Sequence, residues 1–166
     1  MNTLVSMFRP GMRGYLIPLA AGVALTSSAF LPWVVVDGAV RNGIPEVPGL
    51  WIAGLGALSA VLAALSMITR KNSRHPLLVI GLVALGIMFL AWRIMPRLAG
   101  EQALTISQAV AIVGNTPMGS APTALAGSGI YLGLTSATVI VGFGLTIVVK
   151  RAAQPYAVPE LDDDVS

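Results

Sequence analysis

The sequence of 166 residues has no cysteine, a single histidine and few charged residues. Without cysteine, the chain can form neither a disulfide framework nor a thiolate metal site. One histidine cannot supply the several imidazoles of a histidine-rich metal centre. Charged residues make up 10% of the chain and hydrophobic residues 55%, whereas about 25% of an ordinary soluble domain is charged. The composition therefore excludes an ordinary soluble domain and indicates a membrane protein.

The hydrophobic residues are gathered in four long runs, which we predict to be transmembrane helices at residues 14–36, 50–69, 77–95 and 130–149. About 20 residues, rising 1.5 Å each, cross a hydrocarbon core of roughly 30 Å. The expected fold is an all-α integral membrane protein, a bundle of four transmembrane helices. A cleaved signal peptide ending near Ser27-Ser28-Ala29 is the alternative for the first run, but that run continues past this site to Val36 and is long for a signal peptide.

The segments outside the runs divide the chain further. Residues 1–13 form a basic lead, residues 14–149 the transmembrane domain and residues 150–166 an acidic tail. Residues 37–49 form a short connector rich in Gly and Pro, which we expect to turn without forming a domain. Trp33 and Trp92, near the far ends of the first and third runs, have the positions of interfacial anchors.

The longest connector is expected to contain a short amphipathic helix on the membrane surface, between the third and fourth transmembrane helices. Pro96 is expected to end the third helix. In the segment 101–113, apolar side chains recur at helical spacing, and Gly114-Asn115 gives a stop signal. This helix would be about 20 Å long, which is too short to span a bilayer. Its apolar face is formed by Ala103, Ile106, Val110 and Val113.

The basic residues predict the orientation. Seven of the ten Lys and Arg lie in the lead, in the loop after the second run and in the tail, whereas Arg41, Arg93 and Arg97 lie in the other connectors. Because basic residues are enriched on the cytoplasmic side, both termini are expected to be cytoplasmic, in a plasma (inner) membrane. Since the basic residues cluster at the ends of apolar runs, the net charge of +3 does not indicate a nucleic-acid partner.

Small residues at helical spacing predict the helix contacts. Steps of three and four residues return to one helix face, and small side chains there let neighbouring backbones approach closely. The second run carries two such series, and the fourth run carries one with GxxxG-like spacing. The residues concerned are Ala53, Ala57, Ala60 and Ala64; Gly56, Ser59, Ala63 and Ser66; and Gly129, Gly133 and Ala137.

Few residues suggest chemistry. His75 is a candidate ligand of a haem or a pigment, and its alternative role is that of a solvated interfacial residue. Arg93 lies inside an apolar run with Arg97 one turn later, so both are candidates for contact with a solute or a partner subunit; snorkelling to the interface is the alternative. The hydroxyl groups of residues 26–28 could face those of residues 135–138 and line a path.

Trp33 and the sequence Gly49-Leu50-Trp51 resemble the W…GLW signature in the first loop of claudins, which share a four-span topology. The claudin signature continues into a long extracellular sheet with a cysteine pair. This chain has no cysteine, and its GLW adjoins the second apolar run directly. We therefore assign the chain to no family.

The expected function is that of a non-catalytic accessory or scaffolding subunit of a larger membrane complex, with a respiratory or photosynthetic complex as the expected host. Its expected partners are the lipid bilayer and other membrane protein subunits. No nucleophile–base arrangement, P-loop or dinucleotide fingerprint is present, so no enzyme activity and no cofactor are expected. The alternative is a small-solute transporter or channel that uses a path lined by Ser and Thr.

The histidine provides a first test. Replacing His75 with Ala should leave the absorption spectrum of the purified protein unchanged, because a solvated interfacial side chain holds no chromophore. Loss of a haem or pigment band in this variant would instead identify His75 as a ligand.

Overall fold

The computed structural model describes residues 13–69, 73–115, 117 and 120–152, with no side-chain description for residues 13 and 147–152. Residues 1–12 of the basic lead and residues 153–166 of the acidic tail lie outside the described residues. The elements, in chain order, are η1 (Arg13–Tyr15), α2 (Leu16–Ser28), β1 (Pro32–Val36), β2 (Ala39–Asn42), α3 (Val47–Thr69), α4 (Arg74–Gly114), β3 (Ala124–Ala126) and α5 (Ser128–Ala152).

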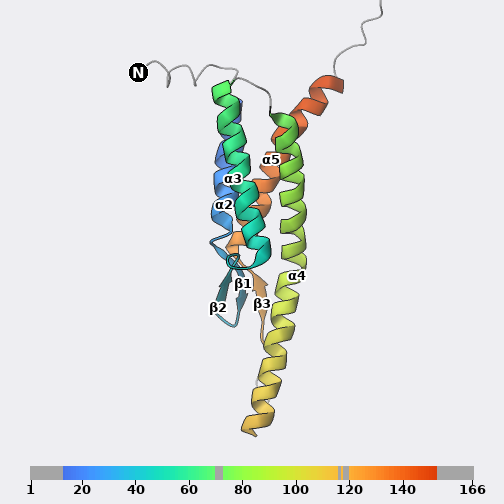
Figure 1. Cartoon of the computed structure of the whole chain (residues 1–166). Coiled ribbons are helices and arrows are strands. Elements are labelled where there is room, and N and C mark those ends of the chain that lie inside the picture. The colour runs from blue at the N-terminus through green and yellow to red at the C-terminus, as the bar shows by residue number, and fades with distance from the viewer. Residues whose placement is uncertain (1–12, 70–72, 116, 118–119, 153–166) are drawn as a thin grey trace, which may run out of the picture.

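The four α-helices pack side by side and alternate in direction, and the three strands gather at one end of the bundle (Figure 1). α2 packs mainly on α3 and α5, and α4 packs mainly on α5. α4 continues well beyond the other helices, past the strands. The described residues therefore form a membrane-type bundle, a small sheet and a projecting half-helix.

In the described part of the chain, three helices are long and apolar enough to cross a membrane: Val47–Thr69, Arg74–Gly114 and Ser128–Thr146. They confirm the helices predicted in the second, third and fourth apolar runs. α2 has 13 residues and is therefore about 20 Å long. It is apolar, but it is shorter than a usual membrane-spanning helix.

The expectation of an all-α fold and of a first helix over residues 14–36 is wrong. α2 ends at Ser28, and the rest of that run forms β1, which pairs with β2 in an antiparallel hairpin. The two residues at the tip, Asp37 and Gly38, both have positive φ (46° and 84°). An Asp-Gly pair between strands that are rich in β-branched residues favours this type of tight hairpin turn. This turn explains why the first apolar run changes from helix to strand.

β3 completes the sheet on the other side of β1, in the order β2-β1-β3 with both pairings antiparallel. A side chain reinforces this pairing. Asp37 Oδ1 accepts hydrogen bonds from Thr123 N (3.0 Å) and Thr123 Oγ1 (3.3 Å), while Asp37 N donates to the carbonyl oxygen of Thr123 (3.1 Å). The hairpin is thereby tied to the segment that leads into α5.

The separate interfacial helix is also a wrong prediction, because the segment 101–113 is the second half of α4. This helix runs unbroken through Pro96 for 41 residues, or about 61 Å. An internal proline costs one hydrogen bond and about 3 kcal/mol, but it need not end a helix whose neighbours are good helix formers. The predicted stop is correct, since Asn115 is left-handed and its N–H donates to the carbonyl oxygens of Ala111 and Ile112.

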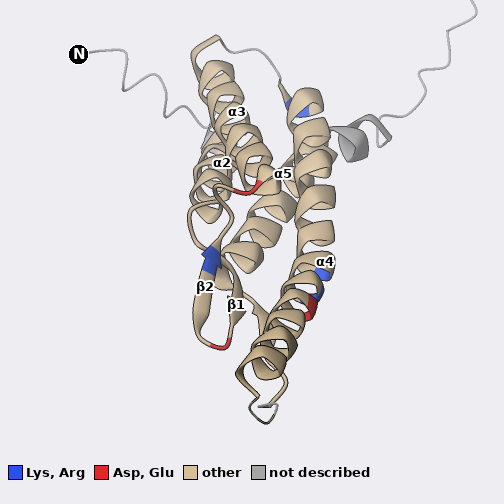
Figure 2. Cartoon of the chain, turned by 60° about the horizontal axis from the view of Figure 1, so that its bottom comes forward, with Lys and Arg blue, Asp and Glu red and all other residues tan. Residues whose placement is uncertain are grey.

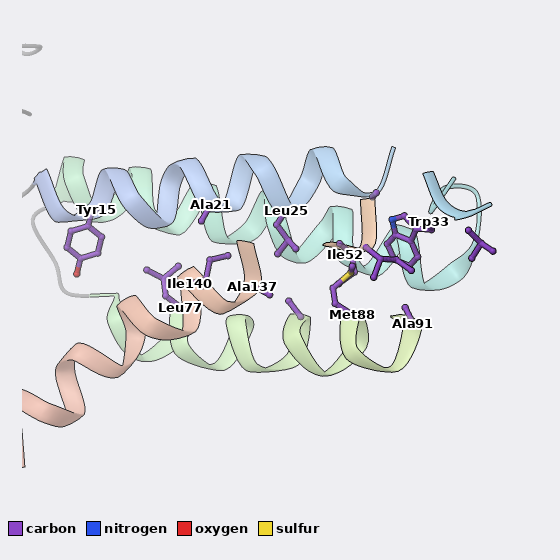
Figure 3. Packing of buried hydrophobic residues seen from close by; sticks show 14 of the residues in the cluster. Tyr15, Ala21, Leu25, Trp33, Ile52, Leu77, Met88, Ala91, Ala137 and Ile140 are labelled. Carbon is purple, nitrogen blue, oxygen red and sulfur yellow. The ribbon is translucent and has the colours of Figure 1, made fainter. Parts of the chain in front are cut away.

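Apolar side chains from all four helices fill the centre of the bundle. Figure 3 shows the row of labelled residues extending from Tyr15 at one end to Trp33 at the other. Leu25, Ile52 and Met88 are fully buried between these ends. Relative to exposure to water, burial of such a side chain contributes about 1.5–3 kcal/mol. Where lipid rather than water surrounds the helices, close packing contributes more to their association than burial does.

Glycine sets the distance between α2 and α3. A Cβ on Gly22 would lie 2.7 Å from Ala60 N, and a Cβ on Gly56 would lie 2.6 Å from Thr26 N. Thr26 Oγ1 donates to its own helix at the carbonyl of Gly22 (3.0 Å) and also reaches the carbonyl oxygen of Ala53 on α3 (3.4 Å). The two backbones are therefore in direct contact.

Aromatic contacts close the bundle at the end away from the strands. The rings of Tyr15 and Phe143 meet edge to face with centroids 5.1 Å apart, and the guanidinium of Arg74 lies 5.5 Å from the centroid of Phe143. Ser73 N donates to the Tyr15 hydroxyl (3.3 Å). η1, the start of α4 and the end of α5 are thus held together.

Two glycines on α3 test the close contact. Gly56→Ala should lower the free energy of unfolding by about 1–3 kcal/mol, because the new methyl group overlaps α2. Gly54→Ala is the matched control, since nothing lies within 4 Å of its Cβ position. Unfolding in mixed micelles, followed by circular dichroism, measures both variants. Equal stability of the two would show that α2 and α3 do not meet at Gly56.

Candidate functional site

Trp33 lies at the junction between the bundle and the sheet. Its side chain is fully buried, and its Nε1–H donates to the carbonyl oxygen of Ser28 at 2.8 Å. Gly43 lies directly against the ring, and a Cβ on Gly129 would lie 2.7 Å from Trp33 Cδ1. The expectation that Trp33 is an interfacial anchor is therefore wrong, because the protein itself covers the indole ring.

A cleft of about 250 Å³ opens beside Trp33, between the β1–β2 hairpin and α4. Its lining combines apolar side chains with polar and charged ones. The apolar lining is Trp33, Val34, Met95, Leu98 and Ala99, and the polar lining is Arg41, Asn42, Glu46 and Gln102. Each element places these residues by its own geometry: Met95, Leu98, Ala99 and Gln102 follow at steps of three, one and three along one side of α4.

An ion pair forms the charged rim of this cleft. Arg41 Nη2 and Glu46 Oε1 are 3.7 Å apart, and their side chains are 57% and 47% exposed. At this separation and exposure the pair is held loosely, since water competes for both groups. The cleft thus presents one cation and one anion, each able to bind a ligand group in place of the other, next to apolar side chains.

The structure separates the small-residue series on α3. Gly56, Ser59, Ala63 and Ser66 are buried, whereas Ala57 is exposed. Ala53, Ala60 and Ala64 are half-buried at the edge of the contact. Ser59 Oγ is buried and has no hydrogen-bond partner among the described residues. The second series therefore faces the bundle, whereas Ala57 faces away from it.

On α5, Gly129, Gly133 and Ala137 are buried on one face. A Cβ on Gly129 would lie 2.7 Å from the carbonyl oxygen of Ser28, and Gly133 lies against the Met88 side chain and Ser28 Oγ. This face of α5 therefore packs between α2 and α4.

The residues considered for chemistry are not brought together. His75 is exposed in the first turn of α4, and Arg93 and Arg97 are exposed further along the same helix. None of the three lines the cleft beside Trp33. Within residues 13–69, 73–115, 117 and 120–152, no group of three or more His, Cys, Asp or Glu could hold a metal ion.

The hydroxyl groups considered as a path bond to their own helices. Ser27 Oγ donates to the Val23 carbonyl oxygen, Ser28 Oγ to that of Leu25 and Thr138 Oγ1 to that of Leu134, at 2.6–3.0 Å. Thr135 and Thr138 are exposed on α5, on the side away from α2, while Ser136 is buried. The arrangement does not form a facing row of hydroxyl groups between α2 and α5.

Sequence reasoning missed the cleft because it missed the hairpin. The available signal was Asp37-Gly38 between Val34-Val35-Val36 and Ala39-Val40, which is a strong local indicator of a two-residue hairpin. Nothing in the sequence indicated that this hairpin would lie against the second half of α4.

Comparisons with protein families, with curated proteins and with solved structures find no match for this chain. The fold and the cleft therefore define its class by themselves: a small helical protein with three helices able to cross a membrane and a sheet at one end of the bundle.

The ion pair at the rim allows a stability test. Glu46→Gln should change the free energy of unfolding by less than about 1 kcal/mol, because a half-exposed pair at this distance contributes little. Thermal unfolding of the variant beside the unchanged protein measures the effect. A much larger loss would mean that Glu46 holds the hairpin in place.

Proposed function

We propose that α2, α3, the first half of α4 and α5 cross the plasma (inner) membrane, with both termini on the cytoplasmic side. Support comes from the distribution of charge. In Figure 2, the first half of α4 is tan, and therefore uncharged, between the blue residue at its start and the blue and red residues farther along the helix. Arg74 and Arg93 bound this part of α4, and they are about 28 Å apart along the helix axis, close to the thickness of the hydrocarbon core.

In this orientation the sheet and the second half of α4 lie outside the membrane, on the side opposite the termini. Arg93 then marks the outer boundary, and the remainder of α4 extends about 32 Å beyond it. The Lys and Arg distribution of seven against three agrees with this orientation. α2 with η1, which is shorter than the other helices, would cross a locally thinned region of the bilayer.

The protein is, on this proposal, a non-catalytic accessory or scaffolding subunit of a larger membrane complex. The projecting half of α4 carries the argument. Ile106, Val110 and Val113, which share one face of the helix, are 64%, 64% and 89% exposed. In water, each such side chain forgoes about 1.5–3 kcal/mol of burial free energy, so a partner subunit that covers them stabilises both chains. A respiratory or photosynthetic complex is the proposed host.

The test is the native mass of the tagged chain after extraction in a mild detergent. A subunit should be recovered in a large particle of fixed stoichiometry, and an absorption spectrum would identify a haem- or pigment-containing host. A colourless particle holding one or a few copies of this chain alone would contradict the proposal.

Two variants of α4 make the test specific. Ile106→Glu should release the chain from the large particle, because it places a charge on the exposed apolar side. Gln108→Glu adds the same charge on the opposite side of the helix and should leave the particle intact. Release by both variants would point to a general effect of charge rather than to a docking face.

A further inference from the structure

We propose that the cleft between the β1–β2 hairpin and α4 binds a zwitterion that carries a phosphate and a primary ammonium group, as in an ethanolamine phospholipid headgroup. This inference goes beyond the proposed subunit role, because it concerns a small ligand of the isolated chain. The basis of the proposal is the ion pair between Arg41 and Glu46 at the rim of a partly apolar cleft.

The two charged groups match the two ends of such a ligand. A guanidinium group binds phosphate oxygens through paired N–H donors, and a carboxylate accepts from the N–H groups of a primary ammonium. Arg41 and Glu46 lie 3.7 Å apart, and both are about half-exposed. A zwitterion can therefore replace one loose internal ion pair with two contacts of its own, without leaving an unpaired charge.

The charge balance of the cleft favours a zwitterion over an anion. Arg41 and Glu46 are the only charged residues of the lining, and together they are neutral. An anionic headgroup would meet the Glu46 carboxylate, whereas a quaternary ammonium has no N–H to donate to it. The amides of Asn42 and Gln102 provide further donors and acceptors for phosphate and glycerol oxygens.

The volume and the apolar lining of the cleft suit a lipid headgroup together with its glycerol unit. A volume of about 250 Å³ is just below the roughly 300–1,000 Å³ of typical small-molecule pockets. Val34, Met95 and Leu98 give apolar contact for the glycerol carbons and the first methylene groups. Acyl chains would have to remain outside the cleft, in the membrane.

The position along α4 matches the headgroup layer. Met95 and Gln102, at the two ends of the α4 lining, lie about 3 Å and 13 Å beyond Arg93 along the helix axis. The polar headgroup region extends about 5–8 Å beyond the hydrocarbon core on each side, so the Met95 end of this wall lies at headgroup depth and the Gln102 end lies farther out. The ligand could come from the membrane as phosphatidylethanolamine or from solution as glycerophosphoethanolamine, and these two sources share the same recognised groups.

The experiment is lipid binding to the purified, delipidated full-length chain, measured by native mass spectrometry with phosphatidylethanolamine, phosphatidylcholine and phosphatidylglycerol of identical acyl chains. Phosphatidylethanolamine should bind about tenfold more tightly than either of the other two, the ratio expected for one charge-assisted hydrogen bond. Glu46→Gln should remove the preference over phosphatidylcholine, because it removes the acceptor of the ammonium N–H groups, whereas Arg41→Gln should weaken binding of all three lipids, because all three carry the phosphate. Arg97→Gln and Glu101→Gln are matched controls outside the lining and should retain the preference.

Equal binding of the ethanolamine and choline lipids, or an unchanged preference in Glu46→Gln, would overturn the proposal. Tighter binding of phosphatidylglycerol would also overturn it, since that result would require a purely cationic site. Competition with glycerophosphoethanolamine separates the sources: displacement of the lipid assigns the site to a free zwitterion, and persistence of the lipid assigns it to the membrane. Because binding is measured on the isolated chain, its failure is distinguishable from failure to assemble with a partner.

Discussion

The burial of Trp33 is the constraint on which the rest of the structure depends. The indole N–H donates to the last carbonyl group of α2, and glycines from the segment after β2 and from the start of α5 lie against the ring. Backbone hydrogen bonds then converge on the same place: Gly127 N donates to the Trp33 carbonyl oxygen at 2.7 Å, and Ile44 N donates to that of Ala29 at 2.9 Å. The end of α2, the hairpin, the segment before α3 and the start of α5 therefore meet around Trp33. Any residue with a Cβ at Gly43 would displace that ring.

Within the bundle, the position of each glycine decides which helix faces meet. Gly22 and Gly56 bring α2 and α3 into backbone contact, and a Cβ on Gly144 of α5 would lie 2.7 Å from Leu78 Cβ of α4. Gly54, Gly86 and Gly142 have nothing within 4 Å of a Cβ position, so they lie on outward faces. In a lipid environment close packing carries much of the association, because apolar burial alone does not distinguish a helix from lipid. Glycine therefore allows close helix contact at some positions and lies on an outward helix face at others, within neighbouring turns of one helix.

α4 connects the two environments of the molecule. Its first half contributes Leu77, Ala84 and Met88 to the core, and its second half leaves large aliphatic side chains exposed. Between them, residues 95–102 form one wall of the cleft. The proposed headgroup site and the proposed partner face thus lie in succession on one rigid element. A partner bound to the distal half would hold α4 in position beside the hairpin, and occupancy of the cleft would do the same from the membrane side. The two proposals are therefore physically compatible, although each has its own test.

The sequence by itself determined the membrane character, three of the four long helices and the stop at Gly114-Asn115, because these depend on local properties: apolar length, charge and backbone preference. It also placed Gly56, Gly129, Gly133 and Ala137 on faces suited to close packing. Asp37-Gly38 is a local signal for the β1–β2 hairpin, but only the tertiary structure decided that β3 pairs with β1 and that the hairpin lies against α4. The continuation of α4 through Pro96 was likewise beyond local rules, because the cost of one lost hydrogen bond is outweighed by packing elsewhere on the helix. The cleft depends on both of these outcomes. It combines residues from β1, β2, the connector before α3 and α4, and their meeting is set by the burial of Trp33 rather than by any spacing along the chain.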